Sequence, residues 1–223
     1  VYAIGDIHGH LEELEVMHAK IKEDIDGNPA LEHQIVYIGD YIDRGPDSAG
    51  VLQCLIEREL YEPNIKHVFI FGNHENGMLE FISNPNGARK DWLDWGGLNA
   101  LMSYGIYPDM TKPLSSQAPD LAGKLAKEIP LSHHEFLNNC VLTYEVGDYF
   151  FVHAGIRPGV SLDKQKKEEL IMIRQGFLDS VEMHEKRVVH GHTAVQTIDI
   201  HPNRINIDTG LYCGRHLTCA VLE

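Results

Sequence analysis

The chain of 223 residues has the length of one α/β domain, and 43% hydrophobic residues are enough to fill a core. Its 33 acidic against 19 basic residues give a formal net charge of -14. This charge disfavours contact with a polyphosphate backbone, so we expect no nucleic-acid partner. The sequence has no run of about 18 apolar residues and no secretory signal pattern, so we also expect no membrane partner.

Four cysteines are spread along the chain without any CxxC pair. This sparse pattern predicts free thiols in a reducing compartment rather than a disulfide framework or a zinc knuckle. It favours a cytoplasmic location. The four are Cys54, Cys140, Cys213 and Cys219.

The N-terminal third alternates between apolar runs and amphipathic segments. The runs at 1–5, 34–40 and 66–75 predict strands, and the spacing of apolar residues predicts helices over 11–25 and 48–60. A β-α-β-α-β opening is typical of an α/β domain, in which ligands bind at the carboxyl ends of the strands. Each of these predicted strands ends in a polar cluster.

The middle of the chain, residues 75–137, is expected to be helical and irregular. It contains a polar Pro/Ser stretch followed by a helix near 121–128, and a further helix is predicted near 164–177. The strands predicted in the last third cover 140–146, 148–155, 187–192, 195–200, 204–210 and 216–222. A tight Gly-Asp turn joins the first two of them. We find no internal repeat and expect a single catalytic domain over residues 1–223.

The first polar cluster, GDIHG at 5–9, places Asp6 and His8 two residues apart at the end of a strand. Taken alone, it fits a surface turn, because Gly and Asp are turn formers. Asp and His at this spacing can equally bind one metal ion. Four further clusters follow strand-like runs: GDYIDRG (39–45), GNHE (72–75), HAG (153–155) and HGHT (190–193). Five such clusters at corresponding strand ends favour a metal site over chance loop composition.

This motif set resembles the phosphoprotein phosphatase branch of the calcineurin-like metallophosphoesterases over nearly the whole chain. The segment WLDWGGLNALMSYG resembles the small bacterial and phage serine/threonine phosphatases of that branch. The resemblance implies an α/β fold in which two mixed β-sheets form a sandwich flanked by helices. It also implies a dinuclear metal site at the edge of this sandwich.

The metal ligands follow from the same resemblance. Asp6 and His8 match ligands of the first metal, and Asp40 matches the carboxylate that bridges both metals. The ligands of the second metal would be Asn73, His153 and His192. Mixed carboxylate, amide and imidazole ligation suits Mn²⁺, which we expect in both sites, with Fe and Zn as alternatives.

Two ions about 3.5–4 Å apart can hold a bridging water or hydroxide for in-line attack on phosphorus, without a phosphoenzyme. His74 matches the general acid of the family, and Asp43 would orient its imidazole. Arg44, and Arg174 in LIMIRQGFL, match the residues that grip phosphate oxygens with a planar fork.

These assignments predict a metal-dependent phosphomonoester hydrolase. The first expectation is a serine/threonine protein phosphatase acting on a phosphorylated protein or a small phosphoester. The alternative is a dinucleoside (diadenosine) tetraphosphatase, whose symmetrical bacterial forms share the metal motifs but typically end the third motif in Asp rather than Glu. A silent binding module is disfavoured because every matched residue is present, and a nuclease is disfavoured by the DRG and GNHE motifs. No feature of the sequence indicates an oligomeric state.

Other conspicuous residues receive plainer interpretations. Glu75 completes GNHE without a metal role. His190 is expected to be a neighbour of the site or a surface residue, and Asp208 a turn residue that supports the site. The remaining residues are assigned to the fold: His10 and His18 to a helix face, His133 and His134 to a loop, Trp92 and Trp95 to the core, and Cys213 to a buried position.

Overall fold

The computed structural model describes residues 1–28, 32–87 and 90–223, which form two mixed β-sheets with flanking helices. The first sheet has the strand order β3-β2-β1-β9, in which β9 is antiparallel to β1 and the other pairs are parallel. Its strands are β1 (Tyr2–Ile4), β2 (Gln34–Tyr37), β3 (Lys66–Phe69) and β9 (Cys219–Val221). Because β1, β2 and β3 are parallel and in register, their carboxyl ends meet at one edge of the sheet.

The second sheet has the order β4-β5-β6-β8-β7, with β5, β6 and β8 parallel and the two outer strands antiparallel. Its strands are β4 (Thr143–Val146), β5 (Tyr149–Val152), β6 (Arg187–His190), β7 (Asp199–Ile200) and β8 (Arg204–Asn206). The predicted Gly-Asp turn joins β4 and β5, and Gly147 adopts a φ of +54° there.

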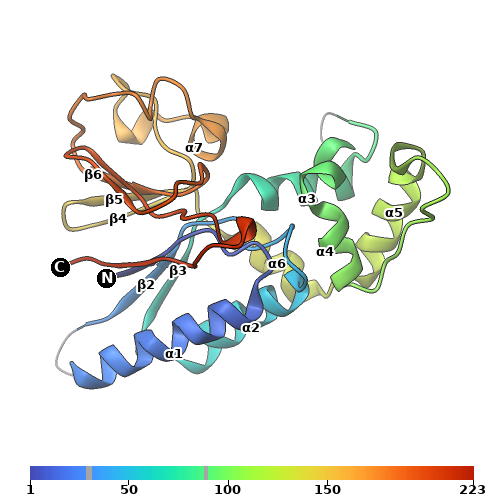
Figure 1. The fold of residues 1–223 in the computed structure, drawn as a ribbon, viewed down its shortest axis with the longest axis horizontal. Coiled ribbons are helices and arrows are strands. Elements are labelled where there is room, and N and C mark those ends of the chain that lie inside the picture. The colour runs from blue at the N-terminus through green and yellow to red at the C-terminus, as the bar shows by residue number, and fades with distance from the viewer. Residues whose placement is uncertain (29–31, 88–89) are drawn as a thin grey trace.

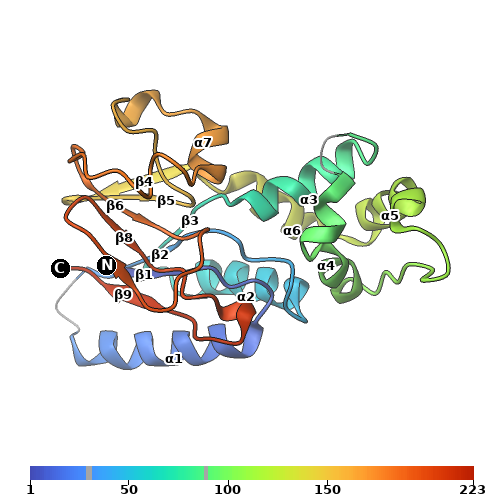
Figure 2. The ribbon, with the colours of Figure 1, turned by 45° about the horizontal axis from the view of Figure 1, so that its top comes forward.

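The two sheets pack face to face, as Figures 1 and 2 show. Val36 and Val68 of the first sheet share a buried cluster with Phe151, Val189 and Ile205 of the second. Alternate residues of the first sheet point to its opposite face, because side chains along a strand alternate. The predicted sandwich of two mixed sheets is therefore confirmed.

Helices cover the outer faces of both sheets (Figure 1). Helices α1 (Leu11–Gly27) and α2 (Ser48–Tyr61) pack on the first sheet, and the short α7 (Lys167–Met172) packs on the second. Helix α2 begins after Asp47, whose side chain accepts a hydrogen bond from the backbone N–H of Gly50. Such a cap satisfies one of the free N–H groups at a helix start.

The middle of the chain forms a helical lobe to one side of the sheets (Figures 1 and 2). Its elements are α3 (Asn73–Ser83), the 3₁₀ helix η1 (Lys90–Trp95), α4 (Gly97–Ser103), α5 (Leu114–Glu128) and α6 (Leu131–Asn139). Helix α3 begins within the third polar cluster, with Gly72 before its first turn and Asn73, His74 and Glu75 in that turn, so this cluster joins the sheet to the lobe.

Two predicted helix boundaries are wrong. Helix α5 starts at Leu114, well before residue 121, and contains Pro119, because a buried face of Ala118, Leu121 and Leu125 outweighs the poor helix propensity of the Pro/Ser stretch. Helix α7 is shorter than the predicted 164–177. It ends at Met172, and the extended backbone of the next residue (φ −63°, ψ 140°) carries the chain away from the helix.

The prediction of a loop around His133 and His134 is also wrong, because both residues lie in α6. His133 is buried, with its Nδ1 2.9 Å from the hydroxyl of Tyr104, whereas His134 bonds to Asn138 on its own helix. The two rings point apart, as expected for adjacent residues of a helix.

Cys213 is exposed rather than buried. It ends the 3₁₀ turn η3 (Leu211–Cys213), which buries Leu211 and leaves Tyr212 and Cys213 at the surface. All four cysteines are free thiols. Within the part of the chain that the structure describes, no helix has the length and apolar character needed to span a bilayer.

Candidate active site

The loops that follow five strands converge at one edge of the sandwich. The first sheet contributes the loops after β1, β2 and β3, and the second contributes those after β5 and β6. The six predicted ligands all lie on these loops or at the start of α3, and all are buried: Asp6, His8, Asp40, Asn73, His153 and His192. Motifs separated by up to 186 residues in the chain thus meet in one place.

The backbone of these loops is unusual. Among the described residues, five that are not glycine have a positive φ, and all five belong to the predicted site: His8, Asp40, Asp43, Arg44 and His192. The left-handed conformation costs an L-residue roughly 1–2 kcal/mol. The surrounding hydrogen bonds hold it in place. For example, the backbone N–H groups of Ile7 and His8 both donate to the carbonyl of Asp40, at 3.1 and 2.8 Å.

Side-chain hydrogen bonds connect the loops of the site and set the orientation of the imidazoles. His153 Nδ1 donates to the carbonyl of Ile38 at 2.9 Å, and His8 Nδ1 donates to that of Ile42 at 3.0 Å. Because a carbonyl only accepts, each ring carries a proton on Nδ1 and directs Nε2 at the site. Metal-binding histidines are typically held in this way.

The carboxylate of Asp40 lies between two groups of potential ligand atoms. His8 Nε2 lies 3.7 Å from Asp40 Oδ2, and His153 Nε2 lies 3.3 Å from Asp40 Oδ1. Each oxygen therefore faces a different group, which suits a bridging carboxylate. Two buried groups have potential ligand atoms that all lie within 4.8 Å of one another. They are His8, Asp40 and His74 on one side, and Asp40, His153 and His192 on the other.

Two buried atoms of the predicted ligands have no hydrogen-bond partner, and a bound cation would serve as that partner. Within the described residues, Asp6 Oδ1 and His192 Nε2 accept no hydrogen bond although both are shielded from solvent. Buried polar atoms are normally paired, because an unpaired one costs about 1–3 kcal/mol. Carboxylate, amide and imidazole donors fit Mn²⁺, Fe or Zn. The residues present therefore fit a dinuclear metal site.

The electrostatics of the cluster favour added positive charge. Burial alone lowers the pKa of His153, but the charge and hydrogen bond of Asp40, with smaller effects of Asp6 and Glu75, raise it to about 10. Burial raises the pKa of Asp6, and the nearby carboxylate of Asp208 raises it further. Divalent ions would stabilise the ionised form of these carboxylates.

His74 forms a dyad with Asp43. Its Nδ1 donates to Asp43 Oδ2 at 2.6 Å, and both side chains are almost fully buried. Burial lowers the pKa of His74, but the charge of Asp40 and the hydrogen bond to Asp43 outweigh it and raise the pKa above its usual value. The geometry holds Nε2 on the side of Asp40, 3.8 Å from its carboxylate.

Arg44 lies beside this dyad, with its Nη2 3.2 Å from His74 Nε2. The carbonyl of Trp95 accepts a hydrogen bond from Arg44 Nε at 3.3 Å, and the guanidinium lies over the ring of Tyr212 at 3.8 Å. Arg174 is exposed on the segment after α7. Burial and the charge of His153 lower the pKa of His192 to about 2, and the charge of Arg174 contributes a smaller part. Arg44 therefore contacts the dyad, whereas Arg174 affects the site only through its charge.

Glu75, to which the sequence assigned no metal role, holds the loops after β2 and β3 together. Its carboxylate accepts hydrogen bonds from the backbone N–H groups of Asp40 (2.9 Å), Tyr41 (2.8 Å) and Gly72 (3.0 Å). Burial, and then the charge of Asp40, raise the pKa of Glu75 to about 7. The sequence did contain a signal for this role. A Glu three residues after a helix-capping position often reaches back to the N–H of the cap residue.

We expect Glu75→Ala to lower the free energy of unfolding by about 3 kcal/mol, since each of the three freed N–H groups costs about 1–3 kcal/mol unless water reaches it. Urea denaturation measures this change. Glu59→Ala, at an exposed position of α2, is the matched control and should shift the stability by less than about 0.5 kcal/mol. Equal stability of the two variants would contradict the role of Glu75.

The remaining residues near the site are supports. His190 is fully buried rather than at the surface, its ring edge contacts Phe177, and burial lowers its pKa to about 3. Asp208 accepts a hydrogen bond from the N–H of Gly210 at 2.9 Å, which fits the predicted turn. His10 precedes α1, and its Nδ1 lies 2.7 Å from the carbonyl of His8.

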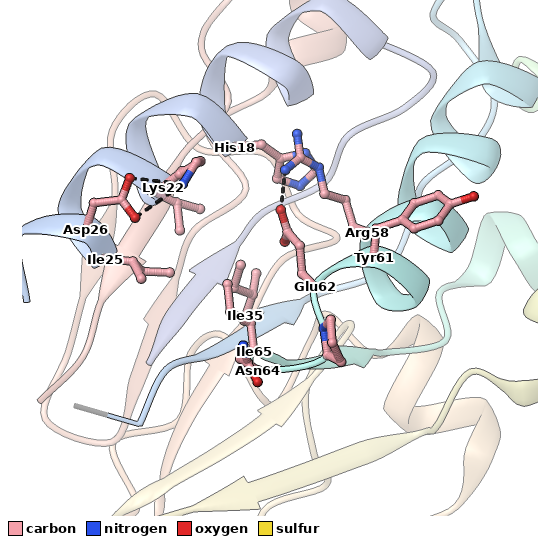
Figure 3. A pocket seen from close by; sticks show the side chains of 12 residues that line it. His18, Lys22, Ile25, Asp26, Ile35, Arg58, Tyr61, Glu62, Asn64 and Ile65 are labelled. Carbon is pink, nitrogen blue, oxygen red and sulfur yellow. Dashed lines mark hydrogen bonds and ion pairs between the residues drawn. The ribbon is translucent and has the colours of Figure 1, made fainter. Parts of the chain in front are cut away.

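A separate cavity of about 200 Å³ lies between α1, α2 and the first sheet (Figure 3). His18 lines it from a buried helix face, and its Nε2 lies 3.0 Å from the hydroxyl of Tyr37. The charged side chains around the cavity pair with one another, Lys22 with Asp26 and Arg58 with Glu62. None of the six predicted ligands lines this cavity, so it is distinct from the candidate active site.

A family model described as calcineurin-like phosphoesterase matches residues 1–208. The chain is 28% identical to the asymmetrical bis(5'-nucleosyl)-tetraphosphatase PrpE of Oceanobacillus iheyensis over 233 residues, covering 96% of this chain and 85% of the relative. It is 37% identical to human serine/threonine-protein phosphatase with EF-hands 2, but over 75 residues, 34% of this chain and 9% of that protein.

The similarity extends to the three-dimensional structure. The crystal structure of a protein assigned as a diadenosine tetraphosphatase superposes with a TM-score of 0.64, over 98% of this chain and 87% of that chain, at 19% identity. At this identity the likeness establishes the fold alone. The family match over most of the chain, together with the two buried His/Asp groups, leads to one conclusion: the chain belongs to the calcineurin-like phosphoesterases and is a metal-dependent phosphoesterase.

Proposed function

We propose that this phosphoesterase hydrolyses dinucleoside tetraphosphates, cleaving them asymmetrically. The observation that carries the proposal is the reach of the similarity: the tetraphosphatase relative aligns over nearly the whole chain, whereas the protein phosphatase relative aligns over about a third of it. The Glu that ends GNHE argues against symmetrical cleavage, and the relatives that align over nearly the whole chain are named as asymmetrical enzymes. The alternative drawn from the motifs thus replaces the first expectation of a serine/threonine phosphatase.

Asp40 would bridge two divalent ions, preferably Mn²⁺, in this proposal. Asp6 and His8 would complete the first site, and the ligands of the second would be Asn73, His153 and His192. When bound, the two ions would supply a polarised water nucleophile and neutralise charge on the phosphate. The chain itself fixes the ligand directions through the Nδ1 hydrogen bonds of His8 and His153.

Arg44 and Arg174 would hold the phosphate oxygens that do not react. Arg44 is suited to this because Tyr212 and the carbonyl of Trp95 already fix its guanidinium, so little side-chain entropy is lost on binding. His74, oriented by Asp43, would deliver a proton from Nε2 to the leaving oxygen. A leaving nucleotide phosphate needs this proton less than a serine alkoxide does, because the phosphate is the weaker base.

The test compares diadenosine tetraphosphate with a phosphoserine/phosphothreonine peptide in Mn²⁺, each with an EDTA control. We expect a higher kcat/KM for the dinucleotide, with ATP and AMP as the products, and no turnover in EDTA. Formation of ADP alone would indicate symmetrical cleavage and contradict the asymmetrical assignment. A higher kcat/KM for the peptide would restore the protein phosphatase function.

A further inference from the structure

The indole of Trp92 reaches into the site from the helical lobe. Trp92 is fully buried in η1, and its Nε1–H donates to Asp43 Oδ2 at 2.7 Å. This is the same oxygen that accepts from His74 Nδ1 at 2.6 Å. The sequence assigned Trp92 to the core, and burial confirms that assignment, but a core residue needs no polar contact with a catalytic dyad.

We propose that Trp92 is a positioning residue, which fixes the carboxylate of Asp43 so that His74 is aimed at the leaving group. The proposal rests on the general-acid role proposed for His74, and it holds for any phosphoester substrate. Two donors converge on Oδ2, while Asp43 Oδ1 has no hydrogen-bond partner among the described residues. The indole is therefore the second contact that determines which oxygen faces the imidazole.

The backbone of Asp43 alone does not determine this orientation. Asp43 has a φ of +73°, and its N–H donates to the hydroxyl of Ser48 at 2.9 Å, which anchors the main chain. The carboxylate can still rotate about its last bond, because terminal torsions of this kind are broad. A donor on a rigid ring restricts that rotation, and a charge-assisted hydrogen bond is among the stronger ones.

The indole itself is held in place by two glycines. A Cβ on Gly77 of α3 would lie 2.7 Å from Cδ1 of the indole, and a Cβ on Gly97 of α4 would lie 2.5 Å from its Cδ2 and Cε2. These distances are shorter than van der Waals contact, so the ring occupies space that any other residue at either position would fill. Phe81 packs on it at a centroid distance of 5.0 Å. The lobe thus holds the donor rigidly against the loops of the sheet.

The experiment measures kcat and KM of Trp92→Phe on aryl phosphates of rising leaving-group basicity, from 2,4-dinitrophenyl to phenyl phosphate, with saturating Mn²⁺. The variant keeps an aromatic ring and loses the N–H. We expect kcat for phenyl phosphate to fall about tenfold, kcat for dinitrophenyl phosphate to fall less than about twofold, and KM to change little. An equal fall on all substrates, or no fall, would overturn the proposal.

Two further variants separate the causes. Phe81→Leu loosens the packing around the indole without removing a donor. It should lower the free energy of unfolding, and any fall in kcat should be the same for all leaving groups. His74→Asn, measured on the same series, tests the general acid itself. If it shows no leaving-group dependence, the role of His74 is wrong; if only Trp92→Phe shows none, the proposal for Trp92 fails alone.

A spectroscopic measurement on the unaltered fold keeps the proposal testable if Trp92→Phe does not fold. The chain has two tryptophans, so its ¹⁵N spectrum contains two indole resonances, which Trp95→Phe assigns. We expect the Trp92 indole proton to lie downfield, to exchange slowly, and to shift in Asp43→Asn. An indole proton at the position of free tryptophan, exchanging rapidly, would overturn the proposal.

Discussion

His74→Asn is expected to lower kcat for an alkyl phosphate by about 10²–10⁴-fold, the usual contribution of a positioned general acid, while both metals stay bound. The loss should be smaller for p-nitrophenyl phosphate, whose leaving group needs little protonation. The physical reason is the geometry of the dyad: Asp43 holds Nδ1 at 2.6 Å, which leaves Nε2 as the atom available for proton transfer. Asparagine keeps a polar side chain of moderate size but cannot donate such a proton.

Steady-state kinetics on both substrates and elemental analysis of the purified variant check this result. His134→Asn is the matched control, because it makes the same exchange in α6, away from the predicted ligands, and it should leave both rates unchanged. Equal losses on the alkyl and aryl substrates would show that His74 is not the general acid. Loss of metal from His74→Asn would instead place His74 among the ligands, as its 3.8 Å distance to Asp40 Oδ2 allows.

Asp40→Asn is expected to release metal from both sites and to lower kcat by at least about 10³-fold, the upper range for losing one preorganised electrostatic partner. Each oxygen of Asp40 faces a different group of ligands, at 3.3 Å from His153 and 3.7 Å from His8. An amide replaces one of these oxygens by an NH₂ group, which cannot bind a cation, and it removes the shared negative charge.

Elemental analysis after gel filtration, together with kcat in added Mn²⁺, measures the effect of Asp40→Asn. Asp26→Asn removes the same charge from an exposed position of α1 and should retain full metal content and activity. Full occupancy of both sites in Asp40→Asn would rule out the bridging role. Occupancy of one site alone would identify the site that depends less on Asp40.

Most strands, and the polar clusters that follow them, were predictable because both depend on local pattern, whereas the roles of the individual residues came from the family resemblance. Buried apolar runs end in glycine and a polar residue, and the parallel strands of the first sheet bring their carboxyl ends together, so Asp6 and Asp40 were expected to lie close. His153 follows β5 of the second sheet, and it joins them because the two sheets pack face to face. The roles of Glu75 and Trp92 depend on contacts across the fold. Glu75 binds the N–H of Asp40 35 residues away, and the indole of Trp92 reaches Asp43 across 49 residues. Contacts between residues so far apart in the sequence cannot be predicted from local spacing.

The substrate was not predictable from the motifs, because the residues that bind the metals and the phosphate serve any phosphoester. The similarity to a tetraphosphatase over nearly the whole chain is what supports our proposal of a dinucleotide substrate. The boundaries of α5 and α7 escaped prediction for a different reason: burial against the rest of the protein decides where these helices begin and end, and helix propensity is a weak guide.

The five left-handed residues of the site also bear on how this protein can be engineered. Their combined conformational cost is on the order of 5 kcal/mol. That is comparable with the net stability of a typical domain, about 5–15 kcal/mol. Glycine at His8 or Asp43 would relieve part of this cost, but it would also remove the side chains proposed to bind metal and to orient His74. Selection for thermal resistance alone would therefore favour inactive variants, so a directed evolution of this enzyme needs activity as a second criterion in every round.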